Sequence, residues 1–475
     1  MAGLNHTLNV GAEALFATRQ GVDTASHNIA NANTPGYSRQ RANLHTRDPS
    51  YSRGVIIGNG VFVKNIQRSH DKFLEKQLNA AAQSTGRSDG RVNALEGLES
   101  IYSPELSASV VDEVTNFFGS LQNLSSYPEE IASRTNLRES ASALITSFKR
   151  VDESLKNEKR NLDEKIAMSA AEITGKLKRI AELNIGIGDM ESGRPDYLAN
   201  DLRDEQERLL REISQDIDIN YYQNRDGLLV VRGPKDSLLV DGKFCSSIET
   251  RLSPEYGGMH GLVVVDHERS RVDDLTPKIT KGRISSLIEV RDTVIDKLLA
   301  KNEEMARTMS EEVNAVHRRG FGMNGFREVS GLNFFEGSEK SGEFVKTMKL
   351  TDPIIDSIDA ISAASTPNSP GDNVIANDLL RLRDKQMLSN ESATLTQYYS
   401  DYVGQLSVDI VASKHRSEAD NIVSNDLNAR REAVSGVSLD EEALNMLKWQ
   451  ANFAASSKVI TTTDEMMETV LNLKR

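Results

Sequence analysis

The 475-residue chain has one cysteine, Cys245, and few long apolar runs. A single cysteine excludes an intrachain disulfide, a cysteine-based zinc cluster and a CxxC redox pair. A membrane-spanning helix needs about 18 apolar residues in succession, whereas the runs here are short, as in Leu228–Val231 and Leu262–Val265. The sequence therefore predicts neither a disulfide-stapled protein nor one inserted in a membrane.

Basic residues are outnumbered, with 57 Lys and Arg against 70 Asp and Glu, a net charge of -13 and a sequence pI near 5.3. This balance disfavours nucleic acid as a partner. No basic leader precedes an apolar core at the N-terminus, where Glu13 is the first charged side chain. We therefore expect no cleaved signal peptide, so the protein either stays in the cytoplasm or leaves by another route.

Catalytic motifs are missing as well. None of the eight histidines has a second one three or four residues away, and His267-Glu268 starts an HExxH motif whose second histidine is replaced by Arg271. The nucleophile elbow, the phosphate-binding loop and the dinucleotide fingerprint do not occur. We expect no enzyme, no metal and no cofactor.

What the chain does have is a heptad-spaced apolar stripe at each end, typical of helices that supercoil. The residues expected to form the subunit-interface seam are Leu4, Leu8, Leu15, Val22 and Ile29 at the N-terminus and Leu439, Met446, Trp449, Phe453, Ile460, Met467 and Val470 at the C-terminus. The two stripes can pair antiparallel only if the middle of the chain folds back on itself. This topology favours an assembly protein.

The two terminal helices have recognisable limits. The turn pair Pro35-Gly36 ends the first one, and Ser438 with Glu441 is predicted to start the last one as a capping box. Only Glu13, Arg19 and Asp23 are charged before Tyr37. So little charge suits a helix buried on several faces in an assembly, although a helix docked on its own domain fits equally well.

Between these ends the pattern predicts a mainly α protein with an inserted β domain. Long helices are expected at about 138–183, 202–213, 286–316 and 395–431, with a short one near 353–364 and a β-hairpin near 54–63 around an Asn-Gly turn. Turn signals and β-branched runs predict a small outward β domain at 217–283, with its own core around Leu229, Val231, Leu239, Val263 and Val265. The predicted domains are a terminal coiled-coil assembly domain (1–40 and 436–475), a helical-bundle stalk (41–216 and 284–435) and the β domain.

One short cassette carries a family resemblance. Residues 30–37 match the A-N-x-x-T-P-G-Y pattern of flagellar rod, hook and hook-associated proteins, and Ser38-Arg39-Gln40 makes the chain resemble the hook-associated members. Segments at 200–213 and 430–442 resemble the same members, whereas the ending at 460–475 is as similar to hook and rod proteins. The motif residues are Ala30, Asn31, Thr34, Pro35, Gly36, Tyr37, Ser38, Arg39 and Gln40.

The resemblance implies a structural subunit of the bacterial flagellum, located at the junction of hook and filament and required for filament assembly. Its implied partners are further copies of itself, the hook protein, the second hook-associated protein, and a type III export chaperone on the C-terminal region. The protein would be extracellular, exported by the flagellar type III system without a cleaved signal. A hook or rod-type axial protein is the alternative, and a cytoplasmic coiled-coil scaffold is a more distant one.

Overall fold

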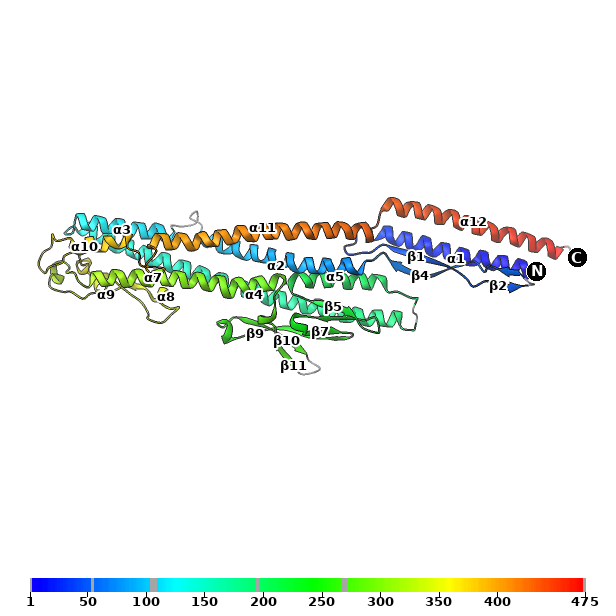
Figure 1. The fold of residues 1–475 in the computed structure, drawn as a ribbon, viewed down its shortest axis with the longest axis horizontal. Coiled ribbons are helices and arrows are strands. Elements are labelled where there is room, and N and C mark those ends of the chain that lie inside the picture. Colours follow the sequence, from blue (N-terminus) through cyan, green and yellow to red (C-terminus); the bar gives the residue numbers. More distant parts are fainter. Residues whose placement is uncertain (1, 53–54, 103–108, 194–195, 267–270, 473–475) are drawn as a thin grey trace.

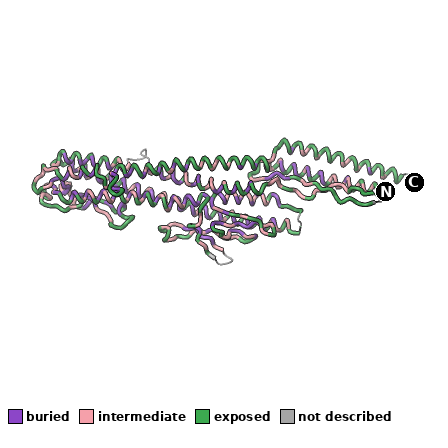
Figure 2. Tube along the Cα trace, viewed as in Figure 1, coloured by how far each residue is buried: buried purple, intermediate pink, exposed green. Residues whose placement is uncertain are grey.

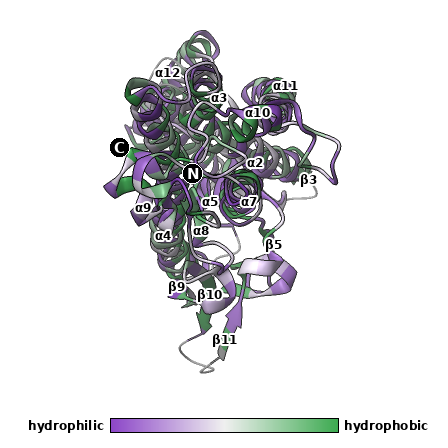
Figure 3. Ribbon diagram, turned by 90° about the vertical axis from the view of Figure 1, so that its left-hand side faces the viewer, coloured by the Kyte–Doolittle hydropathy of each residue, from purple (hydrophilic) through white to green (hydrophobic). Residues whose placement is uncertain are grey.

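The computed structural model describes residues 2–52, 55–102, 109–193, 196–266 and 271–472. The molecule is elongated, and both termini lie together at one end of it (Figure 1). Helices form most of its length and small sheets project from one side (Figures 1 and 3). The predicted class, mainly α with an inserted β domain, is confirmed. Among the described residues, none of the helices is both long enough and apolar enough to span a membrane.

The two ends of the chain form an antiparallel helix pair. Helix α1 (Ala2–Ala30) lies along α12 (Leu439–Asn472). A Cβ built on Gly11 would lie 2.9 Å from Cγ1 of Ile460, and one built on Gly21 would lie 2.5 Å from ring carbons of Trp449. Since the two residue numbers in each contact add to about 470, the helices run in opposite directions. The glycines let the two backbones approach closely.

Most of the expected seam residues are half-buried between the two helices, but three are exposed. Leu439 is 53 % exposed, Phe453 44 % and Val470 40 %. The predicted seam includes contacts between copies, so the role of these three residues stays a prediction. The half-buried residues are Leu4, Leu8, Leu15, Val22, Ile29, Met446, Trp449, Ile460 and Met467.

The hairpin after α1 differs from the expected one. Strand β1 (Gln40–Thr46) pairs with β4 (Val61–Arg68), and β2 (Ser50–Ser52) pairs with β3 (Val55–Ile57). The prediction of one hairpin at 54–63 is therefore wrong, because β3 and β4 do not pair with each other. Asn59-Gly60 does not form a tight turn: the Asn59 amide donates to the Asp48 carbonyl, while Gly60, with φ of +83°, packs against Val10.

The stalk is a bundle of long helices with one large apolar core, and Leu74, Leu78 and Leu427 form a small separate cluster. The longest, α4 (Ile131–Glu191), has 61 residues and is about 90 Å long; it extends beyond the predicted 138–183. Against it pack α2 (Lys72–Tyr102), α3 (Val110–Ser126), α5 (Asn200–Asp216), α6 (Gly282–Glu289), a π-helical turn (Val290–Val294) and α7 (Ile295–His317). Helix α11 (Leu395–Ser435) returns along α2 and reaches α12 (Figure 1).

The β insertion contains two antiparallel sheets beside α4 (Figure 3). The first has the order β5-β6-β7-β8 and the second β11-β10-β9. Their bounds are β5 Asn220–Gln223, β6 Leu229–Arg232, β7 Leu238–Asp241, β8 Phe244–Cys245, β9 Ser247–Leu252, β10 His260–Asp266 and β11 Arg271–Asp274.

The insertion was expected to have a core of its own, but within the described part of the chain its core residues join those of α4. The predicted core residues Leu229, Val231 and Leu239 belong to the same core as α4. In β10 that core includes Leu262 and Val264, whereas Val263 is buried outside it and Val265 is half-buried. The side chain of Asn184 on α4 donates to the carbonyls of Leu229 and Gly242 and accepts the Leu229 N–H. Successive side chains of a strand point to opposite faces of its sheet. Packing against α4 therefore determines which residues of β10 join the core.

The end of the stalk far from the termini is largely irregular. It contains β12 (Phe335–Glu336), α8 (Phe344–Thr347), β13 (Lys349–Leu350) and α10 (Val374–Arg381). The short helix expected at 353–364 is limited to α9 (Asp352–Asp356) and a 3₁₀ turn at Ile358–Ala360.

We predict that Gly21→Ala displaces the Trp449 ring, because the new methyl group would overlap it. Such overpacking typically lowers the free energy of unfolding by about 1–3 kcal/mol. Trp449 is the sole tryptophan, so its fluorescence in the full-length protein should shift to longer wavelength. Gly3→Ala on the same helix is the control, since nothing lies within 4 Å of the Cβ position there. Identical spectra from the two variants would contradict the contact.

Candidate assembly joint

The chain leaves α1 through a tight turn formed by the motif cassette. The Thr34 N–H donates to the Asn31 carbonyl at 2.9 Å, and the Thr34 hydroxyl donates to the Asn31 side chain at 3.2 Å. Gly36 has φ of +85°, a conformation that costs other residues strain. Its Cβ position lies 3.3 Å from the Arg208 side chain. A glycine is needed here to turn the chain against α5.

Asn28, in the last turns of α1, uses its whole amide group. Its NH₂ donates to the Gln40 carbonyl at 2.8 Å and to the Glu442 carboxylate at 3.0 Å. Its oxygen accepts the Tyr37 hydroxyl at 2.8 Å and the Gln40 N–H at 2.9 Å. The residue is 1 % exposed. A buried amide with all partners supplied fixes one local geometry, here the angle between α1, β1 and α12.

Arg39 joins the cassette to α12. Its Nε donates to Glu442 at 2.7 Å and its Nη1 to Glu441 at 2.7 Å. Arg39 and Glu442 are both buried. Burial would lower the pKa of Arg39, but the two carboxylates outweigh it and raise that pKa, so the guanidinium stays charged. The Arg39 N–H also donates to the carbonyl of Ser435, the last residue of α11, at 2.8 Å.

The predicted capping box at the start of α12 is only half formed. The Glu441 N–H donates to the Ser438 hydroxyl at 3.4 Å. Among the described residues, no bond returns from the Glu441 carboxylate to the Ser438 N–H; that carboxylate binds Arg39 instead. The second half of the box is replaced by an ion pair to the cassette.

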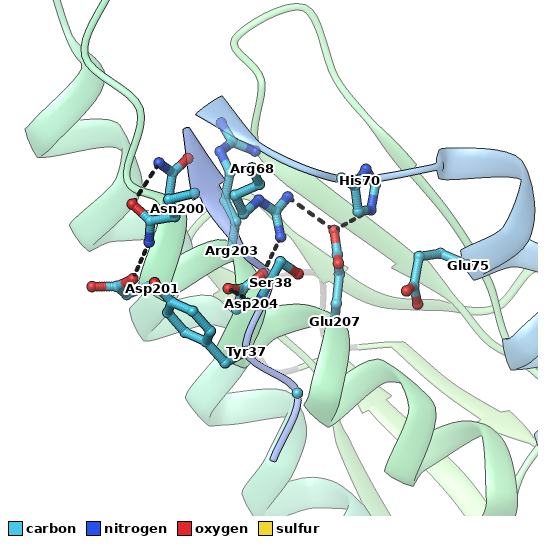
Figure 4. Close-up of polar contacts among 12 residues, drawn as sticks. Tyr37, Ser38, Arg68, His70, Glu75, Asn200, Asp201, Arg203, Asp204 and Glu207 are labelled. Atoms are coloured by element: carbon cyan, nitrogen blue, oxygen red, sulfur yellow. Dashed lines mark hydrogen bonds and ion pairs between the residues drawn. The ribbon is translucent and has the colours of Figure 1, made fainter. Parts of the chain in front are cut away.

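On the stalk side, α5 contacts the cassette and β4 through the buried Asp204 and the half-buried Glu207 (Figure 4). The Ser38 N–H donates to Asp204 at 2.9 Å, and Arg68, at the end of β4, donates to Asp204 at 2.6 Å and to Glu207 at 3.0 Å. Burial raises the pKa of Asp204 despite the Arg68 charge. For Glu207, burial opposes the shift, but the His70 contact and the Arg68 charge lower its pKa.

Two further contacts hold the cassette on α5. The Gln40 side chain donates to Asp201 at 2.7 Å and accepts from Asn200 at 3.2 Å, and Asn200 also donates to the Ile66 carbonyl at 2.8 Å. Burial, together with the nearby Asp201, Asp204 and Glu442 carboxylates, raises the pKa of Tyr37. Tyr37 therefore remains a neutral hydroxyl donor to Asn28.

Helix α11 completes the joint from the opposite side. Arg431 is 5 % exposed and donates to the Gly36 carbonyl at 2.8 Å and to Glu75 on α2 at 3.2 Å. Arg211 on α5 binds the other Glu75 oxygen at 2.7 Å. We use the name assembly joint for these buried contacts, which connect α1, β1 and α12 with α2, α5 and α11.

One part of the joint has the donors of a metal site. Ligand atoms of His70, Glu75 and Glu207 lie within 4.8 Å of one another. The two Glu75 oxygens already bind Arg211 and Arg431, and Glu207 binds Arg68. A metal ion would be repelled by three guanidinium groups and would compete with them for the same oxygens. The arrangement suits an ion-pair network.

The structure thus brings part of the motif into the joint and leaves part of it outside. Ser38, Arg39 and Gln40 are buried there and Tyr37 is half-buried, whereas Ala30, Thr34 and Pro35 are exposed in the turn. The sequence reasoning missed Asn28, Glu442, Asp204 and Arg431 as contacts. Asp204, Arg431 and Glu442 do lie in the segments 200–213 and 430–442 that carry the family resemblance, and this was the available signal.

The flagellar family models match three parts of the chain. The model of the flagellar hook-associated protein FlgK helical domain matches residues 95–335, about half of the chain. The chain belongs to the FlgK family of flagellar hook-associated proteins. A model of flagella basal body rod proteins matches residues 8–37, and a model of the C-terminal part of basal body rod FlgEFG proteins matches residues 432–473. The predicted membership in the flagellar axial proteins is thereby confirmed.

Individual FlgK relatives match nearly the whole chain. Flagellar hook-associated protein 1 of Bacillus subtilis is 27 % identical, with 98 % of this chain and 97 % of the relative covered. The protein of the same name from Escherichia coli is 21 % identical, with 99 % and 100 % covered. The solved structure of the flagellar hook junction protein FlgK from Burkholderia pseudomallei has a similar fold, with a TM-score of 0.67 at 14 % identity, covering 76 % of this chain and 100 % of that one.

We predict that Arg39→Met destabilises the terminal pair by about 3–5 kcal/mol, because it leaves the Glu442 carboxylate buried without its guanidinium partner. Arg41→Met removes the same charge from an exposed position on the same strand and should change stability by less than about 0.5 kcal/mol. Urea unfolding of the full chain, followed by Trp449 emission, distinguishes the two. Equal midpoints would refute the assigned role of Arg39.

Proposed function

We propose that this chain is a structural subunit at the junction between the flagellar hook and filament, where it is required for filament assembly. Copies of the chain associate through the terminal helix pair, residues 1–40 and 436–475. The helical stalk and the outward β insertion surround that contact. The proposal assigns the chain no enzymatic activity.

The exposed face of α12 is the observation that carries this proposal. Between Ala443 and Ser457 the single charged residue is Lys448. Leu444 is 58 % and Leu447 61 % exposed, and Figure 2 shows most of α12 exposed. Large apolar side chains gathered on an exposed surface typically mark a contact with another molecule. Burying each leucine against another copy would contribute about 1.5–3 kcal/mol.

The assembly joint gives this face a defined direction. Arg39, Asn28 and Glu442 hold α12 on the stalk through buried contacts, so the outer face has one orientation relative to α4 and α11. A subunit that stacks in a tube needs such an orientation, because each copy must present the same surface at the same angle.

Hook and rod-type axial proteins are the alternative, and the two end segments favour them as much as a junction protein. The middle of the chain distinguishes the candidates, because residues 95–335 match the FlgK helical domain. A cytoplasmic scaffold is disfavoured by the flagellar cassette and by the low charge of the N-terminal helix.

The proposed neighbours are the hook protein on one side and the second hook-associated protein on the other. An export chaperone that covers the apolar C-terminal region before assembly fits the exposed face of α12. Export by the flagellar type III system, without a cleaved signal, would deliver the protein to this external structure.

Deletion of the gene tests the proposed position. The mutant cells should build complete hooks, carry no filaments and secrete filament subunits into the medium, and this chain supplied from a plasmid should restore filaments. Cells that stop before the hook would indicate a rod-type role, and cells with normal filaments would contradict the proposal.

We also predict that Leu447→Asp blocks filament assembly while the protein is still secreted. The aspartate would be solvated in the single chain, but it would be buried without a partner between copies. Leu252→Asp in the β insertion, at a residue that is 68 % exposed, is the control and should leave filaments normal. Secretion into the medium is measured separately, because the proposed chaperone region includes Leu447.

A further inference from the structure

We propose that His317 makes the end of the stalk far from the termini sensitive to acid. We call this end the distal cap, residues 318–364, which follow α7 and pack against α4 (Figure 1). Protonation of the His317 ring at Nε2 removes its bond to the Ser362 N–H, places a charge inside the cap and loosens the cap from the stalk. The inference goes beyond the proposed function and does not depend on it.

The ring of His317, in the last turn of α7, joins two segments of the distal cap that are far apart in the chain. Its Nδ1 lies 2.7 Å from the Leu332 carbonyl oxygen, and its Nε2 lies 2.9 Å from the Ser362 backbone nitrogen. The residue is 0 % exposed, and its ring packs edge-on against that of Phe334, with centroids 5.4 Å apart. His317 therefore holds both segments at one point on α7.

These two partners fix the protonation state of the ring. A carbonyl oxygen can only accept a hydrogen bond, so Nδ1 carries the ring hydrogen and donates to Leu332. A backbone N–H can only donate, so Nε2 presents its lone pair to Ser362. A second proton on Nε2 would point at another donor. The neutral ring satisfies both segments of the cap, whereas an imidazolium would leave the Ser362 N–H buried without an acceptor.

The surroundings of the ring also oppose a positive charge. Burial lowers the pKa of His317 to about 4; the bond to Leu332 opposes this shift, and the Arg134 guanidinium on α4 adds to it. Arg134 is itself 1 % exposed and donates to the Ile361 carbonyl at 2.6 Å. The cap thus already encloses one cation beside the histidine, and protonation of the ring would add a second.

The acids of neighbouring elements are paired elsewhere. Asp359, in the cap, accepts the Asn324 amide at 2.9 Å, and its charge acts on Arg134. Asp378, on α10, binds Arg319 at 3.1 Å. Within the part of the chain that the structure describes, none of the carboxylates forms a hydrogen bond or an ion pair with the ring. A protonated ring would therefore lack a counterion.

Acid weakens the cap because the unfolded ring, with its ordinary pKa of about 6.5, binds a proton more readily than the buried one. The contribution of His317 to stability is fully present above about pH 6.5 and is lost as the pH falls toward the folded pKa of about 4. These two values predict that the equilibrium constant for opening the cap rises about 30-fold between pH 7.5 and pH 5. A subunit of an external structure such as the flagellum meets the pH of the medium, so its cap would respond to acid there.

Hydrogen exchange of the full chain at pH 7.5 and pH 5, corrected for the intrinsic pH dependence of exchange, tests the inference. In the wild-type chain, peptides covering residues 331–335 and 358–364 should show an opening constant about 30-fold larger at pH 5. In His317→Gln the amide oxygen can still accept from Ser362 but takes up no proton, so the increase should be lost. His415→Gln, at an exposed histidine on α11, is the matched control and should retain the wild-type increase.

A second measurement on the wild-type chain decides the case in which His317→Gln does not fold. Nuclear magnetic resonance with isotope-labelled histidine should show one ring that is protected from solvent and carries its hydrogen on Nδ1 at both pH values. Equal opening constants at the two pH values, an unchanged increase in His317→Gln, or the absence of a protected Nδ1–H ring would each overturn the inference. The proposed position at the junction would stand in all of these cases.

Discussion

The orientation of the terminal helices depends on one buried ion pair, between the Arg39 guanidinium and the Glu442 carboxylate. The two atoms of the Nε contact are 2.7 Å apart, and the Glu442 side chain also accepts the Asn28 amide. A buried pair of this kind adds little net stability compared with apolar side chains, but breaking it is costly because a charge is left without a partner. Its main effect here is therefore to permit one arrangement of α1, β1 and α12.

Charge is sparse along α1, and the joint supplies specific polar contacts at one end of the terminal pair. These contacts use Asn28, Arg39 and Glu442. Gly11 and Gly21 let α1 and α12 pack closely, which leaves the opposite face of α12 free. One helix thus serves two contacts, one within its chain and one proposed between copies.

Much of the architecture could be predicted from periodicity, since the heptad stripes located both terminal helices and turn residues located the β insertion. Periodicity could not predict which elements pair or pack with one another. The hairpin was misplaced because Asn59-Gly60 has the sequence of a tight turn, while tertiary contacts to Val10 and Asp48 decide its geometry. The inward face of β10 was wrong by one residue, because four consecutive apolar residues carry no alternation.

In the joint, sequence reasoning identified the cassette but not its partners. Glu442 is 402 residues from Gln40 in the chain, and only the folded-back topology brings α12 to the cassette. Glu441 was expected to cap its own helix, and it binds Arg39 instead because the cassette places a guanidinium within reach. Acids on a helix surface give no local sign of which one becomes buried, and here Glu442 is buried while Glu441 stays exposed.

Filament counts in four strains test the central role of this ion pair most directly: wild type, Arg39→Met, Glu442→Gln and the double variant. If Arg39 acts by neutralising the buried Glu442, Arg39→Met alone should lose filaments. Adding Glu442→Gln should restore most of them, because the amide removes the uncompensated charge and still accepts from Asn28. A double variant no better than Arg39→Met, or an Arg39→Met strain with normal filaments, would contradict the account.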